Sequence, residues 1–202
     1  MMNKFKGNYL LEGGNLYDPY KDKKVRSSIL IQNGKVKETG KISHSGNVKI
    51  INCKGKIISP GFIDIHAHFR EPGREDKETL LTGAWAAFSG GFTRVCVMPN
   101  TDPPLDSPES IRFIIEKATD LPVKIFPIGA ITVNQEGVEI TEIGKMVDAG
   151  AVAISDDGFP VQNGQVMRYA VEYAKKFHIP VINHAEDIHL RNEGVMNENT
   201  LS

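Results

Sequence analysis

Residues 60–68 read PGFIDIHAH, and the chain changes character at this point. The Pro-Gly pair precedes an apolar run that we expect to form a strand, and His66 and His68 follow at its end. Residues two apart on a strand point to the same side, so the two imidazoles face one way and can share a divalent cation. A His-x-His pair alone is more often two surface or hydrogen-bonded histidines, so other segments of the chain are needed to distinguish that interpretation from a metal site.

C-terminal to this stretch, apolar runs alternate with stretches that have helical spacing and capping residues. This alternation predicts an α/β fold with a parallel sheet. The pattern alone leaves two architectures open: an open doubly wound sheet, and the first five βα units of a TIM barrel. We expect strands at 62–66, 94–98, 123–127, 151–155 and 180–184, and helices at 75–89, 107–119, 141–149 and 164–177.

Residues 1–59 have the pattern of a small β-rich domain, distinct from a larger one at 60–202. Asn33 and Gly34 form the dipeptide of a tight hairpin turn, and the basic run 21–26 is expected to be a solvated loop. A domain of this size buries little surface alone, so we expect it to pack on the rest of the protein. The short strands are expected at 9–11, 28–32, 35–38, 49–52 and 56–58.

The composition excludes several classes of partner. The 202 residues include 24 Lys and Arg against 25 Asp and Glu, and the net charge is -1. A polyanion-binding protein needs clustered basic residues, so neither nucleic acid nor a membrane surface is an expected partner. Two cysteines give no disulfide framework. Without an apolar leader or a long apolar run, we expect a cytoplasmic protein.

Two further strands are expected to end in groups that bind metals. Asp156 and Asp157 follow the fourth expected strand, and His184 follows the fifth. Adjacent carboxylates before a glycine are often only a polar turn, but three strands that deliver ligands at one end are hard to explain by coincidence. Barrel enzymes place their catalytic groups at this end of the strands. A borderline cation such as Zn²⁺ fits imidazole plus carboxylate.

Arg70 and Asn100 are candidates for binding a substrate. Arg70 lies two residues after His68, and Asn100 follows the second expected strand. The arginine fork recognises carboxylates, and the asparagine amide adds a donor and an acceptor. Taken singly, each is equally well explained by structure, Arg70 by a salt bridge and Asn100 by a turn.

These segments together resemble the dihydroorotases of the amidohydrolase superfamily. The resemblance runs from about Leu30 to the end of the chain, and it is most specific in the Arg-Glu-Pro-Gly and Met-Pro-Asn-Thr pieces. Hydantoinases and allantoinases share the His-x-His pair, but usually carry a carboxylated lysine where this chain has Asp-Asp-Gly. The segments are 60–73 (PGFIDIHAHFREPG), 90–93 (GGFT), 98–104 (MPNTDPP), 129–132 (GAIT), 155–158 (SDDG) and 184–187 (HAED).

The resemblance implies a zinc centre with one or two ions in a metal-dependent TIM barrel. It also implies that the β-rich domain at 1–59 is half of a composite β-sandwich. His66 and His68 would bind one metal, and Asp157 would bridge to a second metal held by His184. The choice between Asp156 and Asp157 stays open, because a shift of one residue in register would exchange them.

The implied activity is the reversible conversion of dihydroorotate and N-carbamoyl-L-aspartate in pyrimidine biosynthesis. Arg70 and Asn100 would hold the substrate carboxylate. The resemblance also suggests a homo-oligomer and aspartate transcarbamoylase as a possible partner. One alternative is an allantoinase- or hydantoinase-like cyclic amidase, whose substrate would leave Arg70 and Asn100 unpaired. Another is a non-catalytic subunit that scaffolds aspartate transcarbamoylase and would have no use for aligned ligands.

The chain departs from the family pattern in its length, so we interpret it as the N-terminal portion of a dihydroorotase. The family's remaining metal-binding histidine and its general acid/base aspartate are expected beyond residue 202, and we therefore assign no catalytic acid/base here. The barrel is expected to be incomplete, and the 202-residue chain alone to be inactive.

Overall fold

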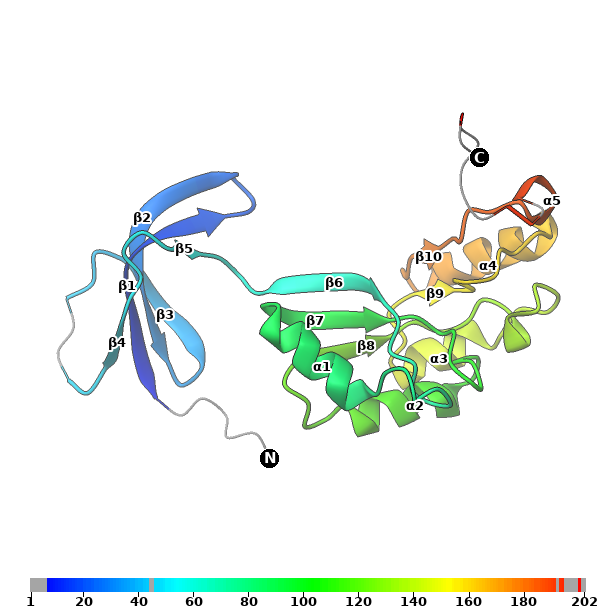
Figure 1. Ribbon diagram of the computed structural model, residues 1–202, viewed down its shortest axis with the longest axis horizontal. Coiled ribbons are helices and arrows are strands. Elements are labelled where there is room, and N and C mark those ends of the chain that lie inside the picture. Colours follow the sequence, from blue (N-terminus) through cyan, green and yellow to red (C-terminus); the bar gives the residue numbers. More distant parts are fainter. Residues whose placement is uncertain (1–6, 44–45, 192, 195–199, 201–202) are drawn as a thin grey trace. The chain divides into compact units, whose positions relative to one another are not determined.

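The structure is a computed structural model and describes residues 7–43, 46–191, 193–194 and 200. The chain divides into two compact units, residues 1–61 and 62–202, and each is described by itself (Figure 1).

The first unit is a five-stranded sheet with the order β3-β2-β1-β4, in which β5 also pairs with β1. β1 pairs antiparallel with β2, and β2 with β3, whereas β4 and β5 run parallel to β1. The predicted hairpin turn is confirmed, since Asn33 and Gly34 have φ of 50° and 75°. The strands are β1 (Asn8–Asp18), β2 (Lys23–Gln32), β3 (Lys35–Gly40), β4 (Lys49–Asn52) and β5 (Ile57–Ile58).

The sequence prediction was wrong about residues 12–14 and about part of the basic run. The glycines do not end the first strand but make a bulge within β1, where the register with β2 shifts. Gly13 has a φ of 69°, and a Cβ on Gly14 would lie 2.5 Å from Cδ1 of Ile58. Lys23 begins β2, so most of the basic run is an exposed strand end.

The second unit contains strands that are all parallel and follow one another in chain order. β6, β7 and β8 form one sheet and β9 pairs with β10, while a bridge between Gly129 and Ile154 links the two. A doubly wound sheet would reverse its strand order, so the structure favours the partial barrel. The strands are β6 (Phe62–Ala67), β7 (Phe92–Val97), β8 (Lys124–Pro127), β9 (Ile154–Ser155) and β10 (Val181–Ile182).

Helices cover one side of these strands (Figure 1). Val95 and Val97 of β7 and Leu80 and Ala84 of α1 belong to the large apolar core, and a smaller cluster is formed by Met98, Ile128 and Ala153. No helix in the described part of the chain is long and apolar enough to cross a membrane. The helices are α1 (Leu80–Ser89), α2 (Pro108–Lys117), the 3-10 turn η1 (Val133–Gln135), α3 (Ile143–Ala149), α4 (Gly164–Lys176) and α5 (Ile188–Arg191).

Helix α1 begins five residues later than the sequence predicted, at Leu80 rather than Glu75. Thr79 is its N-cap, and its hydroxyl accepts a hydrogen bond from the backbone N–H of Thr82 while the Thr82 hydroxyl accepts from the N–H of Thr79. This reciprocal capping box fixes the start of the helix. Residues 75–77 form a turn, and residue 78 has no regular structure.

Candidate metal centre

Three histidines from two strand ends meet one carboxylate from a third. His66 is in β6 and His68 follows it, Asp157 follows β9, and His184 lies two residues after β10. Oδ2 of Asp157 lies 3.2 Å from Nε2 of His66 and 3.3 Å from Nε2 of His68. The other oxygen, Oδ1, lies 3.2 Å from Nδ1 of His184. The carboxylate therefore faces the His66–His68 pair with one oxygen and His184 with the other.

These distances fit a tetrahedral cation site. Atoms bound at about 2.0–2.1 Å to a tetrahedral zinc ion lie about 3.3–3.4 Å from one another. His66, His68 and Asp157 can each offer one ligand atom, all within 4.8 Å of one another. Nitrogen and carboxylate oxygen donors suit zinc and similar divalent ions. The residues present could thus hold a metal ion, with His184 on the far oxygen of Asp157.

Asn100 sets the orientation of one of these rings. Its Oδ1 lies 2.9 Å from Nδ1 of His68, and an amide oxygen can only accept, so Nδ1 carries the hydrogen. Nε2 of His68 is then left with a lone pair that faces Oδ2 of Asp157, an arrangement suited to a cation between them. A hydrogen bond on the second ring nitrogen is a usual feature of metal-binding histidines.

The structure separates the two adjacent aspartates. Asp156 is 2% exposed, and its Oδ1 accepts hydrogen bonds from the backbone N–H groups of Ile131 (2.7 Å) and Thr132 (3.1 Å). The Thr132 hydroxyl donates to its other oxygen. Burial raises the pKa of the Asp156 carboxyl, although these donors act in the opposite direction. Asp156 is therefore committed to the loop after β8, and Asp157 alone of the two faces the histidines.

Arg70 and Asn100, the sequence-predicted substrate residues, lie next to each other beside His68. Nη1 of Arg70 is 3.5 Å from the backbone oxygen of Asn100. The Asn100 side chain is shared with His68, a contact that the sequence analysis did not foresee. Sequence reasoning also gave no role to Glu186, whose carboxylate pairs with Arg191 at 2.9 Å and lies 3.7 Å from Nε2 of His184.

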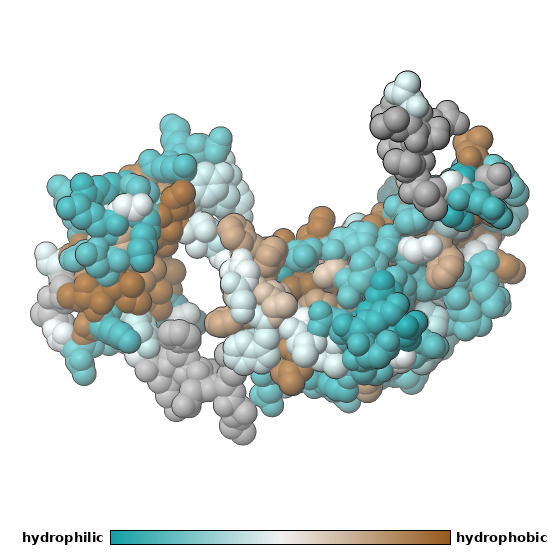
Figure 2. Space-filling model, viewed as in Figure 1, coloured by the Kyte–Doolittle hydropathy of each residue, from teal (hydrophilic) through white to brown (hydrophobic). Residues whose placement is uncertain are grey.

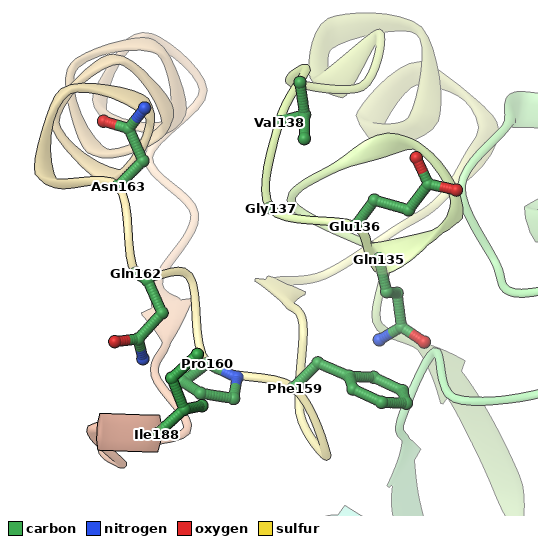
Figure 3. A pocket seen from close by; sticks show the side chains of 9 residues that line it. All are labelled: Gln135, Glu136, Gly137, Val138, Phe159, Pro160, Gln162, Asn163 and Ile188. Carbon is green, nitrogen blue, oxygen red and sulfur yellow. The ribbon is translucent and has the colours of Figure 1, made fainter. Parts of the chain in front are cut away.

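An open pocket of 610 Å³ lies over the loops after β8 and β9 (Figure 3). Among the described residues, Gln135 carries a buried side-chain nitrogen, Nε2, with no hydrogen-bond partner. Phe159 and Pro160 also line the pocket and come directly after the Asp157–Gly158 turn. Pocket and metal centre are thus both built on the segment that follows β9.

The fold resembles solved amidohydrolase structures. An L-hydantoinase (dihydropyrimidinase) from Arthrobacter aurescens superposes with a TM-score of 0.78 at 22% identity, over 90% of this chain and 41% of that one. A dihydroorotase crystal structure gives a TM-score of 0.56 at 14% identity, over 87% and 50%. The prediction of a partial amidohydrolase barrel with an N-terminal β unit is confirmed at the level of the fold.

The family described as Dihydro-orotase-like matches residues 55–202. A relative named dihydroorotase, from Acetivibrio thermocellus, is 46% identical over 190 residues, which is 94% of this chain but 45% of that protein. The chain therefore belongs to the dihydroorotase-like family, as its motifs indicated. It spans about half the length of the curated relatives that it matches.

Proposed function

We propose that the protein carrying this sequence is a zinc-dependent cyclic amidase that interconverts dihydroorotate and N-carbamoyl-L-aspartate in pyrimidine biosynthesis. The observation that carries the proposal is the convergence of His66, His68 and His184 on the Asp157 carboxylate. Arg70 and Asn100, side by side next to His68, support a substrate with a carboxylate.

Each residue has a defined task in this proposal. His66 and His68 would hold one zinc ion together with Asp157, and His184 would help to hold a second one. Such ions, when bound, polarise the ring amide carbonyl and lower the pKa of water. Arg70 binds the substrate carboxylate through its guanidinium fork and so orients the ring for attack. The proton donor for the leaving nitrogen is expected from residues beyond Ser202.

The runner-up is a hydantoinase- or allantoinase-like cyclic amidase, and the likeness to the L-hydantoinase fold supports it. Its substrates lack the carboxylate, which would leave the Arg70 guanidinium without its partner, and sites built for a polar group reject ligands that lack it. A non-catalytic subunit bound to aspartate transcarbamoylase is the alternative outside enzymes. For the dihydroorotate-converting enzyme, we also propose assembly as a homo-oligomer.

The test is an assay of the full-length protein with its metal content measured by elemental analysis. We expect zinc to co-purify, chelation to abolish turnover and zinc to restore it, with dihydroorotate and N-carbamoyl-L-aspartate preferred over hydantoin and allantoin. Preference for hydantoin would favour the runner-up. A full-length protein that folds, binds zinc and converts none of these substrates would contradict the proposed activity.

A further inference from the structure

Glu71 is a buried carboxylate between the candidate site and two helices. The residue is only 4% exposed. Its Oε2 accepts a hydrogen bond of 2.7 Å from the backbone N–H of Leu80, the first residue of α1. Oε1 forms an ion pair with Nζ of Lys117, the last residue of α2. One side chain thus ties the segment after His68 to the start of one helix and the end of another.

The segment from His68 to Glu71 alternates between two sides. Phe69 is buried in the large core against α1, so closely that a Cβ on Gly83 would lie 2.7 Å from its ring. Glu71 turns to the same helix. His68 and Arg70, between them in sequence, contact Asn100 instead. Phe69 and Glu71 therefore anchor the segment to the core and α1, whereas His68 and Arg70 belong to the candidate site.

A second clamp holds the end of the same segment to the loop that carries Asn100. The backbone N–H of Asp102 donates to the carbonyl of Pro72 at 3.0 Å. Gly73 has a φ of 92°, and a Cβ on it would lie 1.9 Å from the carbonyl oxygen of Asp102. The two loops are in direct backbone contact, so a displacement of residues 71–73 would also move Arg70 against Asn100.

The presence of a buried charged side chain at position 71 is not explained by stability alone. A buried ion pair is often no more stabilising than apolar side chains of similar volume. A carboxylate that accepts from a helix N-terminal N–H and from an ammonium group does, however, fix direction as well as distance. Directed bonds on residue 71 restrict the backbone that carries residue 70.

We propose that Glu71 is a positioning residue that fixes Arg70 for a substrate carboxylate. The inference rests on the proposed function, because it takes the ligand of Arg70 from there. The carboxylate of Glu71 bonds to the start of α1 and the end of α2, so Glu71 is not itself assigned a contact with the substrate. Its effect should pass through Arg70, and this distinguishes it from a residue that only stabilises the fold.

The test is a double-mutant cycle in the full-length protein. Glu71→Leu should raise KM for N-carbamoyl-L-aspartate about tenfold, with kcat and zinc content little changed, since the loss is one of substrate binding. Added to Arg70→Ala, it should raise KM no further, because the group that it positions is gone. Glu71→Gln, which keeps an acceptor for Leu80, should fall between wild type and Glu71→Leu. Lys117→Met, which spares the Leu80 bond, is the matched control with the smaller effect.

Two results would overturn the proposal. The first is an equal effect of Glu71→Leu with and without Arg70, or a common fall in kcat, zinc content and melting temperature, since either indicates a purely structural role. The second is unchanged amide hydrogen exchange at 68–73, a readout that needs no turnover: in Glu71→Leu the exchange should speed up there and at Leu80, whose N–H loses its acceptor, and stay unchanged in the rest of the chain. If the wild type lacks activity, the proposed function fails, and unchanged exchange at 68–73 would then separately reject the role of Glu71.

Discussion

At the scale of single residues, Asp157 is the group on which the proposed metal centre depends. Its two oxygens face three imidazole nitrogens at 3.2–3.3 Å, so its loss would remove both contacts at once. Asp157→Asn should lower zinc affinity by more than about 100-fold, since changes to groups behind the ligands already cost 10–100-fold. Zinc content after dialysis against a graded chelator measures this. A variant that retains zinc like the wild type would contradict the bridge.

Substitution of the neighbouring Asp156 should lower the stability of the fold rather than the affinity for zinc. Its carboxylate accepts from two backbone N–H groups and a hydroxyl, all buried, and an asparagine cannot satisfy all three. Asp156→Asn should therefore lower the free energy of unfolding by about 1.5–3 kcal/mol, the usual range for hydrogen bonds to a charged group. Urea denaturation of the zinc-free protein checks it. A loss of zinc without a loss of stability would reverse the assignment of the two aspartates.

The sequence alone could not distinguish which of the two aspartates is the metal ligand, and the reason is physical. Both follow a short buried strand, and each is a plausible turn residue or ligand. The choice is made by Ile131 and Thr132, which lie about 25 residues away in the chain and present their N–H groups to Asp156. By contrast, His66 and His68 needed only the two-residue period of a strand to be placed on one side.

At the scale of elements, the loop after β8 is held in an unusual backbone conformation. Asn134 and Gln135 have φ of 53° and 57°, a region that costs side-chain-bearing residues roughly 1–2 kcal/mol. The Asn134 N–H is held by the carboxylate of Asp106 at 2.9 Å. A glycine meets no steric cost there but loses more entropy on folding.

Asn134→Gly should thus raise the free energy of unfolding by about 0.5–1 kcal/mol. Glu136→Gly is the matched control in the same loop, because Glu136 has an ordinary helical φ of -86° and its replacement should destabilise. Urea denaturation of both variants makes the comparison. If both substitutions destabilise equally, the left-handed conformation is not strained.

Element positions were predictable where a local signal sets them. The Ser107 cap and Pro108 gave the start of α2, and the Asn33–Gly34 turn set the β2–β3 hairpin. The start of α1 was missed, because helical spacing in the sequence extended back to Glu75 while the Thr79 cap and Glu71 impose a later beginning. The bulge at Gly13–Gly14 was missed because the close approach of Ile58 to Gly14 is a contact between residues distant in sequence.

At the scale of the whole chain, both units expose large apolar side chains. Ile63 and Ile65 of β6 are 54% and 68% exposed, and β6 pairs with β7 on one side only. The first unit exposes Val36 and Ile57 at 63% and 60%, and Figure 2 shows a broad hydrophobic area on its surface. An unpaired strand edge with apolar side chains favours association.

We therefore expect the 202-residue chain, prepared alone, to be inactive and prone to aggregate. Opening or closing a cyclic amide needs an activated nucleophile and a proton donor for nitrogen. His66, His68, Asp157 and His184 supply candidate ligands for the first. The carboxylates of Asp156 and Glu186, which lie near the same strand ends, are already engaged with Thr132 and Arg191. Unclosed strands also hold the ligands less rigidly, and catalysis falls steeply with small misplacements. The measurement is a zinc-loaded turnover assay with light scattering, and full-length protein is the positive control. Turnover approaching ~1 s⁻¹, the low end of ordinary enzymes, would mean that a chain with only the five strands β6–β10 in its second unit suffices for catalysis.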